Sequence, residues 1–133
     1  MSVFGRRVSG TTVAGVALLM VVAALLPVMT SEPVRDIVLV TRDMTFYLDG
    51  DMSTPNPMIE VKAGERVRVV LRNEERGLMH DFAVPAMHSA INALRWSEQG
   101  DVTFEIPDAP GTYEYVCRPH LLMMKGIITV VAD

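Results

Sequence analysis

The residues best suited to chemistry lie close together in the last quarter of the chain. Cys117 is the only cysteine, His120 follows three residues later, and Met123 and Met124 come soon after. A thiolate, an imidazole and a thioether together favour a soft metal such as copper over hard cations. A copper centre of the electron-transfer type combines one cysteine with two histidines and a weakly bound methionine, so a second histidine is needed from elsewhere in the chain.

Only two other histidines could complete such a site, His80 and His88. A single cysteine on an inward-facing position is usually a small core residue, so Cys117 alone would not predict a metal. One cysteine and two histidines could also form an open zinc site. The methionines after His120 favour copper over zinc, because a thioether is a soft ligand.

The N-terminal residues predict an export segment. Arg6 and Arg7 precede residues 8–29, which carry no charge and are long enough to span a bilayer. We favour an uncleaved anchor over a cleaved signal within residues 1–31, because the apolar run is long and no clear cleavage site precedes Ser31. The arginines would stay in the cytoplasm, so residues 32–133 would form one exported domain on the periplasmic or extracellular face.

Charge and cysteine content narrow the classes of function. With Arg6 and Arg7 set aside, 10 basic and 16 acidic residues remain, a net charge of about −6 that disfavours nucleic acid as a partner. Outside the cytoplasm a lone cysteine has no partner for a disulfide within the chain, and metal ligation explains Cys117 best. We find no nucleophile–base pair or phosphate-binding loop, so we expect neither an enzyme nor a small-molecule substrate.

Short apolar segments separated by turns predict an all-β sandwich of about seven or eight strands, preceded by an N-terminal hydrophobic helix. Tyr113, Tyr115 and Cys117 share one strand face, which places the thiol inward. Residues 86–96 fit either one helical turn or a long loop. The strands that we predict individually are residues 37–40, 58–61, 67–71, 102–106, 113–117 and 127–131.

Three separated stretches of the sequence carry a family resemblance. They are residues 60–67 followed by Asn73, the His80-Asp81-Phe82 step, and the loop of residues 117–126. In this order they resemble the turn and strand, the first histidine ligand and the ligand loop of the cupredoxins, the blue-copper proteins that include plastocyanin, amicyanin and azurin. The resemblance covers about residues 37–131 and implies a Greek-key sandwich that binds one copper ion, cycling between Cu(II) and Cu(I).

The resemblance also implies a role for each residue of the site. His80, Cys117 and His120 would be the strong ligands. Met124 would be the axial ligand, as in azurin-like loops, whereas the shorter spacing of amicyanin would select Met123 instead. The polar residue after the first histidine often holds the ligand loop in this family, so Asp81 is expected to have that supporting role. The alternative is that Asp81 is a solvent-exposed carboxylate at the start of a strand.

The predicted function is that of a membrane-tethered electron carrier. Its partners would be redox proteins of an electron-transport chain, which would dock on an apolar patch formed by Leu121, Leu122 and Met123 around His120. A copper delivery, storage or sensing protein could use the same ligands. A cupredoxin-fold interaction module without metal is a third alternative, against which the complete ligand set argues.

Overall fold

The computed structural model describes residues 33–133, which fold into nine β-strands and two short 3-10 helices. The predicted hydrophobic helix and anchor of residues 1–31 lie outside the described residues. Neither short helix of the described range has the length or the apolar character needed to cross a bilayer. The elements are β1 (Arg35–Arg42), β2 (Thr45–Leu48), β3 (Ile59–Lys62), β4 (Arg66–Asn73), β5 (His80–Val84), η1 (Pro85–Met87), β6 (Ser89–Leu94), β7 (Gln99–Glu105), β8 (Gly111–Val116), η2 (Arg118–His120) and β9 (Lys125–Val131).

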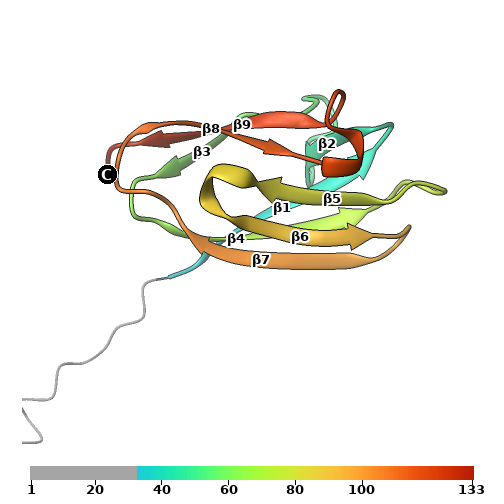
Figure 1. The fold of residues 1–133 in the computed structure, drawn as a ribbon, viewed down its shortest axis with the longest axis horizontal. Coiled ribbons are helices and arrows are strands. Elements are labelled where there is room, and N and C mark those ends of the chain that lie inside the picture. The colour runs from blue at the N-terminus through green and yellow to red at the C-terminus, as the bar shows by residue number, and fades with distance from the viewer. Residues whose placement is uncertain (1–32) are drawn as a thin grey trace, which may run out of the picture. The chain divides into compact units, whose positions relative to one another are not determined.

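The strands form two sheets that face each other (Figure 1). One sheet has the order β2-β1-β4-β7 and the other has the order β3-β9-β8-β5-β6. β1 runs parallel to β4 and β3 runs parallel to β9, while the other paired neighbours are antiparallel. The predicted all-β sandwich is confirmed, with nine strands in place of seven or eight.

Alternation of apolar and charged residues explains how the strands bury one face. In β4 the side chains of Val67, Val69 and Leu71 are buried between the sheets, whereas Arg66 and Arg68 are exposed. A strand with this period of two places one face in the core and the other in water.

Three aromatic side chains fill the core. Phe46, Phe82 and Tyr115 are fully buried, and the ring centroids of Tyr115 lie 5.4 Å from Phe46 and 5.6 Å from Phe82. The Tyr115 hydroxyl donates a hydrogen bond to the Pro57 carbonyl at 2.6 Å. The buried phenol therefore keeps a polar partner, while its ring packs in the core two residues before Cys117.

The segment of residues 86–96 is mainly a strand, which the sequence did not reveal. Pro85 begins the single turn of η1, His88 ends it at a left-handed φ of 49°, and β6 then pairs with β5. The pairing of β6 with β5 shifts register between His80 and Phe82. The buried residues Ile91 and Leu94 are three apart as a result, so the alternation that marks a strand is lost.

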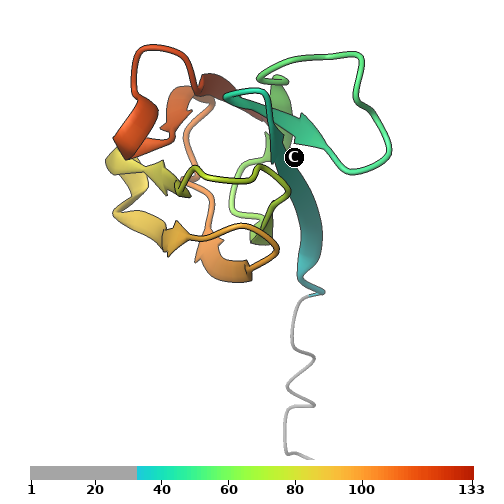
Figure 2. The ribbon, with the colours of Figure 1, turned by 90° about the vertical axis from the view of Figure 1, so that its right-hand side faces the viewer.

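The loops that carry the candidate ligands lie at one end of the sandwich. In Figure 1 the start of β5 and the β8–β9 connection lie at the end opposite the C-terminus. Figure 2 looks onto this end, where the red-orange segment that contains η2 lies beside β5. Residues distant in sequence are thereby brought to one place.

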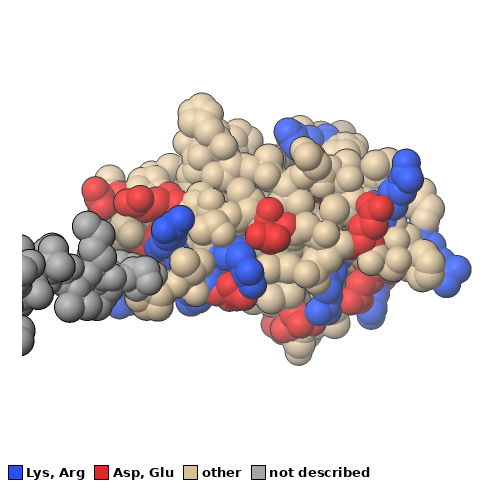
Figure 3. Space-filling view, turned by 90° about the horizontal axis from the view of Figure 1, so that it is seen from below, with Lys and Arg blue, Asp and Glu red and all other residues tan. Residues whose placement is uncertain are grey.

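Charged side chains outside the core form exposed ion pairs. Asp36 and Arg68 lie 2.6 Å apart, and Asp49 and Arg72 lie 2.8 Å apart. On the face drawn in Figure 3 basic and acidic side chains are interspersed and do not gather by sign. Such exposed pairs each contribute only about 0–1 kcal/mol, so the buried core carries most of the stability.

Candidate metal centre

The structure brings together three of the predicted ligands, His80, Cys117 and His120. His80 is the first residue of β5, Cys117 follows β8, and His120 is the last residue of η2. The Cys117 Sγ atom lies 3.8 Å from His80 Nδ1 and 3.6 Å from His120 Nδ1. One donor atom from each residue lies within 4.8 Å of the other two. His80 and Cys117 are fully buried, and His120 is partly exposed.

These distances fit a single metal ion between the three side chains. First-row metals bind thiolate sulfur at about 2.3 Å and imidazole nitrogen at about 2.0 Å. With angles near about 120°, an ion in a trigonal plane holds sulfur and nitrogen about 3.7 Å apart. Among the described residues no carboxylate belongs to the cluster, so its donors are the sulfur and nitrogen atoms that suit copper.

Backbone hydrogen bonds fold the ligand loop into a compact turn. The Cys117 N–H donates to the Met124 carbonyl at 2.9 Å, and the Met124 N–H donates to the His120 carbonyl at 2.9 Å. The His120 N–H donates to the Cys117 carbonyl at 3.1 Å. Two candidate ligands, Cys117 and His120, and the candidate axial methionine therefore belong to one loop that closes on itself.

The two candidate axial residues have opposite environments. Met124 is 0% exposed and belongs to the core, whereas Met123 is 59% exposed. The Met123 carbonyl accepts a hydrogen bond from the Asn56 side chain at 3.1 Å, which ties the loop to a neighbouring turn. The axial role of Met124, with Met123 as the alternative, stays a prediction.

Asp81 contacts the ligand loop. Its Oδ1 atom accepts a hydrogen bond from the Arg118 N–H at 2.7 Å, and its Oδ2 atom lies 2.6 Å from Arg118 Nε. The Asp81 side chain is 4% exposed, so the Arg118 guanidinium neutralises a nearly buried charge. These contacts are of the kind expected for the supporting role, and their effect on a bound metal stays a prediction.

Burial changes the acid–base properties of two candidate ligands. Burial raises the pKa of the Cys117 thiol. Burial also lowers the pKa of His80, against the opposing effect of the nearby Glu75 carboxylate. Without metal both side chains are therefore neutral near neutral pH, and binding of a metal through the Cys117 thiolate would release the thiol proton.

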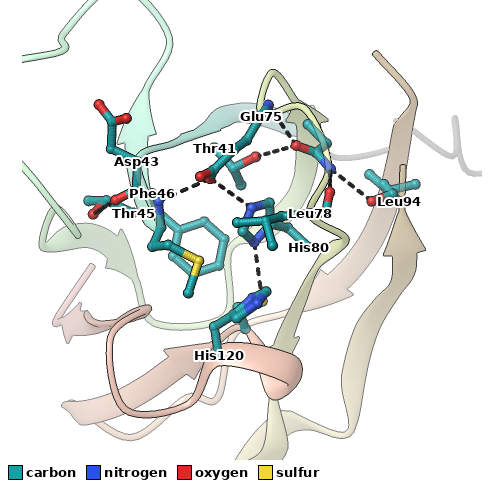
Figure 4. A network of polar contacts seen from close by, with 12 residues as sticks. Thr41, Asp43, Thr45, Phe46, Glu75, Leu78, His80, Leu94 and His120 are labelled. Atoms are coloured by element: carbon teal, nitrogen blue, oxygen red, sulfur yellow. Dashed lines mark hydrogen bonds and ion pairs between the residues drawn. The ribbon is translucent and has the colours of Figure 1, made fainter. Parts of the chain in front are cut away.

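Sequence reasoning missed Glu75, whose carboxylate contacts the candidate ligand His80. Glu75 Oε2 lies 2.9 Å from His80 Nε2, the ring nitrogen that faces away from Cys117 (Figure 4). Glu75 lies in the turn between β4 and β5 beside another acid, Glu74, and nothing in the sequence distinguishes the two. Only the conformation of this turn reveals the contact.

His88 lies outside the cluster. It ends the turn of η1, its side chain is exposed, and its N–H donates to the Pro85 carbonyl. Of the two histidines that could complete the site, the cluster therefore contains His80 and not His88.

The fold and the cluster agree with a sequence comparison. The sequence profile of the cupredoxin-like domain family matches residues 15–130. The chain belongs to the cupredoxin-like family. The resemblance drawn from three short stretches is thereby confirmed, and the cluster of His80, Cys117 and His120 fits a type 1 copper site.

Solved structures similar to this cupredoxin-like chain have low sequence identity. Reduced auracyanin from Roseiflexus castenholzii is 18% identical, with a TM-score of 0.59 over 72% of this chain and 96% of that chain. Rusticyanin from Thiobacillus ferrooxidans is 22% identical, with a TM-score of 0.59 over 76% of this chain and 79% of that chain. Copper nitrite reductase from Nitrosomonas europaea is 20% identical, with a TM-score of 0.60 over 76% of this chain and 42% of that chain.

At these identities the structural likeness establishes the fold alone. No curated protein matches the chain as a relative by sequence. The function of this cupredoxin-like chain must therefore be argued from its own residues.

Proposed function

We propose that this protein transfers single electrons through one copper ion held by His80, Cys117 and His120. Met124 would be the weak fourth ligand, with Met123 as the alternative. The observation that carries the proposal is the position of the Cys117 sulfur, 3.8 Å and 3.6 Å from one nitrogen of each histidine. Bound copper supplies a one-electron couple between Cu(II) and Cu(I).

The chain contributes a site that is held before metal binds. His80 and Cys117 are fully buried, and Asp81 joins the two segments that carry them by accepting the Arg118 N–H. Within residues 33–133 no buried side-chain nitrogen or oxygen lacks a hydrogen-bond partner. Donors fixed in this way move little when the metal changes its charge, and small rearrangement favours fast electron transfer.

His120 offers a route for electrons to the surface. It is the partly exposed ligand, and the residues after it form the docking patch of Leu121, Leu122 and Met123. Leu121 is 51% exposed and Leu122 is 93% exposed. We infer that redox proteins of an electron-transport chain contact this patch, because exposed apolar clusters often mark partner sites. A carrier of this kind is not an enzyme and needs no site for a small-molecule substrate or nucleic acid.

We further propose that the domain acts on the periplasmic or extracellular face of a membrane. The support is the sequence of the N-terminal segment, with Arg6 and Arg7 before the uncharged residues 8–29. This segment would serve as a signal-anchor and would keep the copper domain close to membrane-bound partners.

The test is the visible spectrum of the full-length protein after addition of copper(II). We expect an intense thiolate-to-copper band that is absent from Cys117→Ser and retained in His88→Ala, which changes a histidine outside the cluster. A wild type without the band, or a band that survives Cys117→Ser, would contradict the proposal.

The alternative of copper delivery, storage or sensing makes a different prediction for metal release. A carrier keeps copper in both oxidation states, whereas a delivery protein gives Cu(I) to an acceptor. Rapid loss of Cu(I) from the reduced protein to a competing chelator, with retention of Cu(II), would favour delivery over electron transfer.

A further inference from the structure

Glu75 lies behind His80, on the side of the imidazole away from the cluster. Glu75 Oε2 is 2.9 Å from His80 Nε2, and the same oxygen accepts the Met44 N–H at 3.0 Å. The Glu75 side chain is only 17% exposed, so water screens its charge incompletely. Figure 4 shows the carboxylate pointing at the ring of His80, with His120 beyond it.

A buried amide holds the turn that carries Glu75. The Asn73 Oδ1 atom accepts the Glu75 N–H and the Thr41 hydroxyl, each at 2.9 Å. The Asn73 amide donates to the carbonyls of Leu78 and Leu94, also at 2.9 Å. Asn73 and Thr41 are fully buried. Both ends of the turn are therefore anchored, and Glu75 has little freedom to leave His80 (Figure 4).

The β1–β2 hairpin also takes part in this arrangement. Asp43 and Met44 form its two-residue turn at left-handed φ values of 51° and 54°. Such turns favour asparagine and glycine, and a methionine in this conformation is strained. The Met44 N–H is directed at Glu75, so a strained turn supplies one of the two donors that hold the carboxylate.

The chemistry of these contacts selects one tautomer of His80. An ionised carboxylate only accepts hydrogen bonds, so His80 Nε2 must carry the proton that Glu75 receives. Nδ1 is then left with a lone pair, and Nδ1 is the atom that lies 3.8 Å from Cys117 Sγ. A carboxylate bound to the far nitrogen of a metal-ligating histidine fixes the ring and makes it a stronger donor.

The negative charge of Glu75 would also affect the oxidation state of a metal bound to His80. A negative charge one imidazole away from a metal stabilises the more positive oxidation state. The neighbouring acid Glu74 carries the same charge but is paired with Arg42 at 3.0 Å and Arg72 at 3.3 Å. Asp81 is likewise paired with Arg118.

We propose that Glu75 is a positioning residue of the metal centre, which holds His80 as the Nε2–H tautomer and favours Cu(II) over Cu(I) by its charge. The inference rests on the proposed function, because it concerns the same site. Glu75 would then lie outside the ligand set and still influence both the orientation of His80 and the reduction potential of the copper.

Two substitutions in the full-length protein separate charge from orientation. Glu75→Gln keeps an oxygen for the Met44 N–H and His80 Nε2–H but removes the charge. We expect the preference for Cu(II) over Cu(I) to fall at least tenfold, which raises the reduction potential by 59 mV for each factor of ten. The measurement is a spectroelectrochemical titration. Glu74→Gln removes the same charge one residue away and should change the preference less than threefold.

Glu75→Ala tests the orientation of His80 without any metal. Nitrogen-15 NMR of the metal-free protein distinguishes the two imidazole tautomers, and we expect wild type and Glu75→Gln to hold the Nε2–H form. In Glu75→Ala the His80 signals should move to those of mixed tautomers. Retention of a pure Nε2–H form in Glu75→Ala, or equal potentials in Glu75→Gln and Glu74→Gln, would overturn the proposal.

The tautomer measurement also separates this inference from the proposed function. A wild type that gives no thiolate-to-copper band contradicts copper electron transfer. The NMR comparison of wild type with Glu75→Ala still decides whether Glu75 orients His80.

Discussion

Asp81 and Arg118 join the two segments that carry the candidate ligands. The Asp81 carboxylate accepts the Arg118 N–H at 2.7 Å and lies 2.6 Å from the Arg118 guanidinium. Asp81 directly follows His80, and Arg118 directly follows Cys117. The contact therefore links the segment of β5 that carries His80 to the loop after β8 that carries Cys117.

Removal of this contact should loosen the site. We expect Asp81→Ala to lower the free energy of unfolding by about 2 kcal/mol, because hydrogen bonds to a charged and nearly buried group are lost. Urea denaturation of the metal-free protein measures the change. Asp81→Asn keeps an acceptor for the Arg118 N–H, so its free energy of unfolding should fall less than that of Asp81→Ala. Equal stability of wild type and Asp81→Ala would show that other contacts hold the loop.

Much of the fold was predictable because its strands obey simple periodicity. The residues of β4 alternate between core and solvent, and the inward face shared by Tyr115 and Cys117 follows from the same period of two. Periodicity failed for β6, where a shift of register in the pairing with β5 spaces the buried residues by three. A local pattern cannot reveal an irregularity that is set by the partner strand.

The residues of the cluster were predictable for a different reason. Cys117 is the only cysteine and the chain has three histidines, so few combinations were possible. Glu75 could not be found in this way, since the chain has 16 acidic residues and none is marked by its neighbours. Its contact with His80 depends on the amide of Asn73 and on the strained turn at Met44, which are properties of the folded chain.

Gly126 packs against the ring of Tyr115, and a larger residue should not fit. A Cβ atom added at Gly126 would overlap the end of the Tyr115 side chain, which is fully buried. We expect Gly126→Ala to lower the free energy of unfolding by about 1–3 kcal/mol, as overpacking of a core does. Gly111→Ala is the control, since its nearest neighbours lie 3.9 Å away. Urea denaturation measures the free energy of unfolding of both variants. An equal decrease in Gly126→Ala and Gly111→Ala would argue against close packing at Gly126.

Glu65 should make stability depend on pH in the acid range. It binds Arg35 through both carboxylate oxygens, and this hydrogen bonding holds the pKa of Glu65 below its ordinary value. A carboxyl with a lower pKa in the folded state stabilises the fold above its unfolded pKa of about 4.3, and the contribution is lost as pH falls through the folded pKa.

We therefore expect Glu65→Gln to lower the free energy of unfolding by about 0.5–1 kcal/mol at pH 7, and this difference to shrink as the pH falls through the folded pKa of Glu65. Urea denaturation at a series of pH values measures the difference. Glu60→Gln changes an exposed acid on the adjacent strand and serves as the control. A difference between Glu65→Gln and wild type that persists undiminished at the lowest pH would contradict the electrostatic origin.

The buried methionine of the ligand loop should influence the copper spectrum. Leucine has a volume close to that of methionine, so Met124→Leu should fold while losing the thioether. We expect the thiolate-to-copper band to remain but to shift, and the reduction potential to change, because an axial ligand tunes both. Met123→Leu makes the same change at an exposed position and should leave the spectrum unaltered. The reverse result would assign the axial role to Met123.

The most exposed residue of the docking patch should control electron exchange without affecting the metal. Leu122 is 93% exposed, so Leu122→Asp should leave the visible band and the stability unchanged. In electron self-exchange, which NMR line broadening measures, the docking patches of two copies of the protein would contact each other. We expect the rate constant to fall about tenfold in Leu122→Asp, because two like charges would then face each other during the encounter. Added salt should restore part of the loss by screening these charges.

Val34→Asp places the same charge at another exposed apolar residue, before β1, and should leave the rate unchanged. An equal loss in both variants would mean that net charge, and not the patch around His120, limits the exchange.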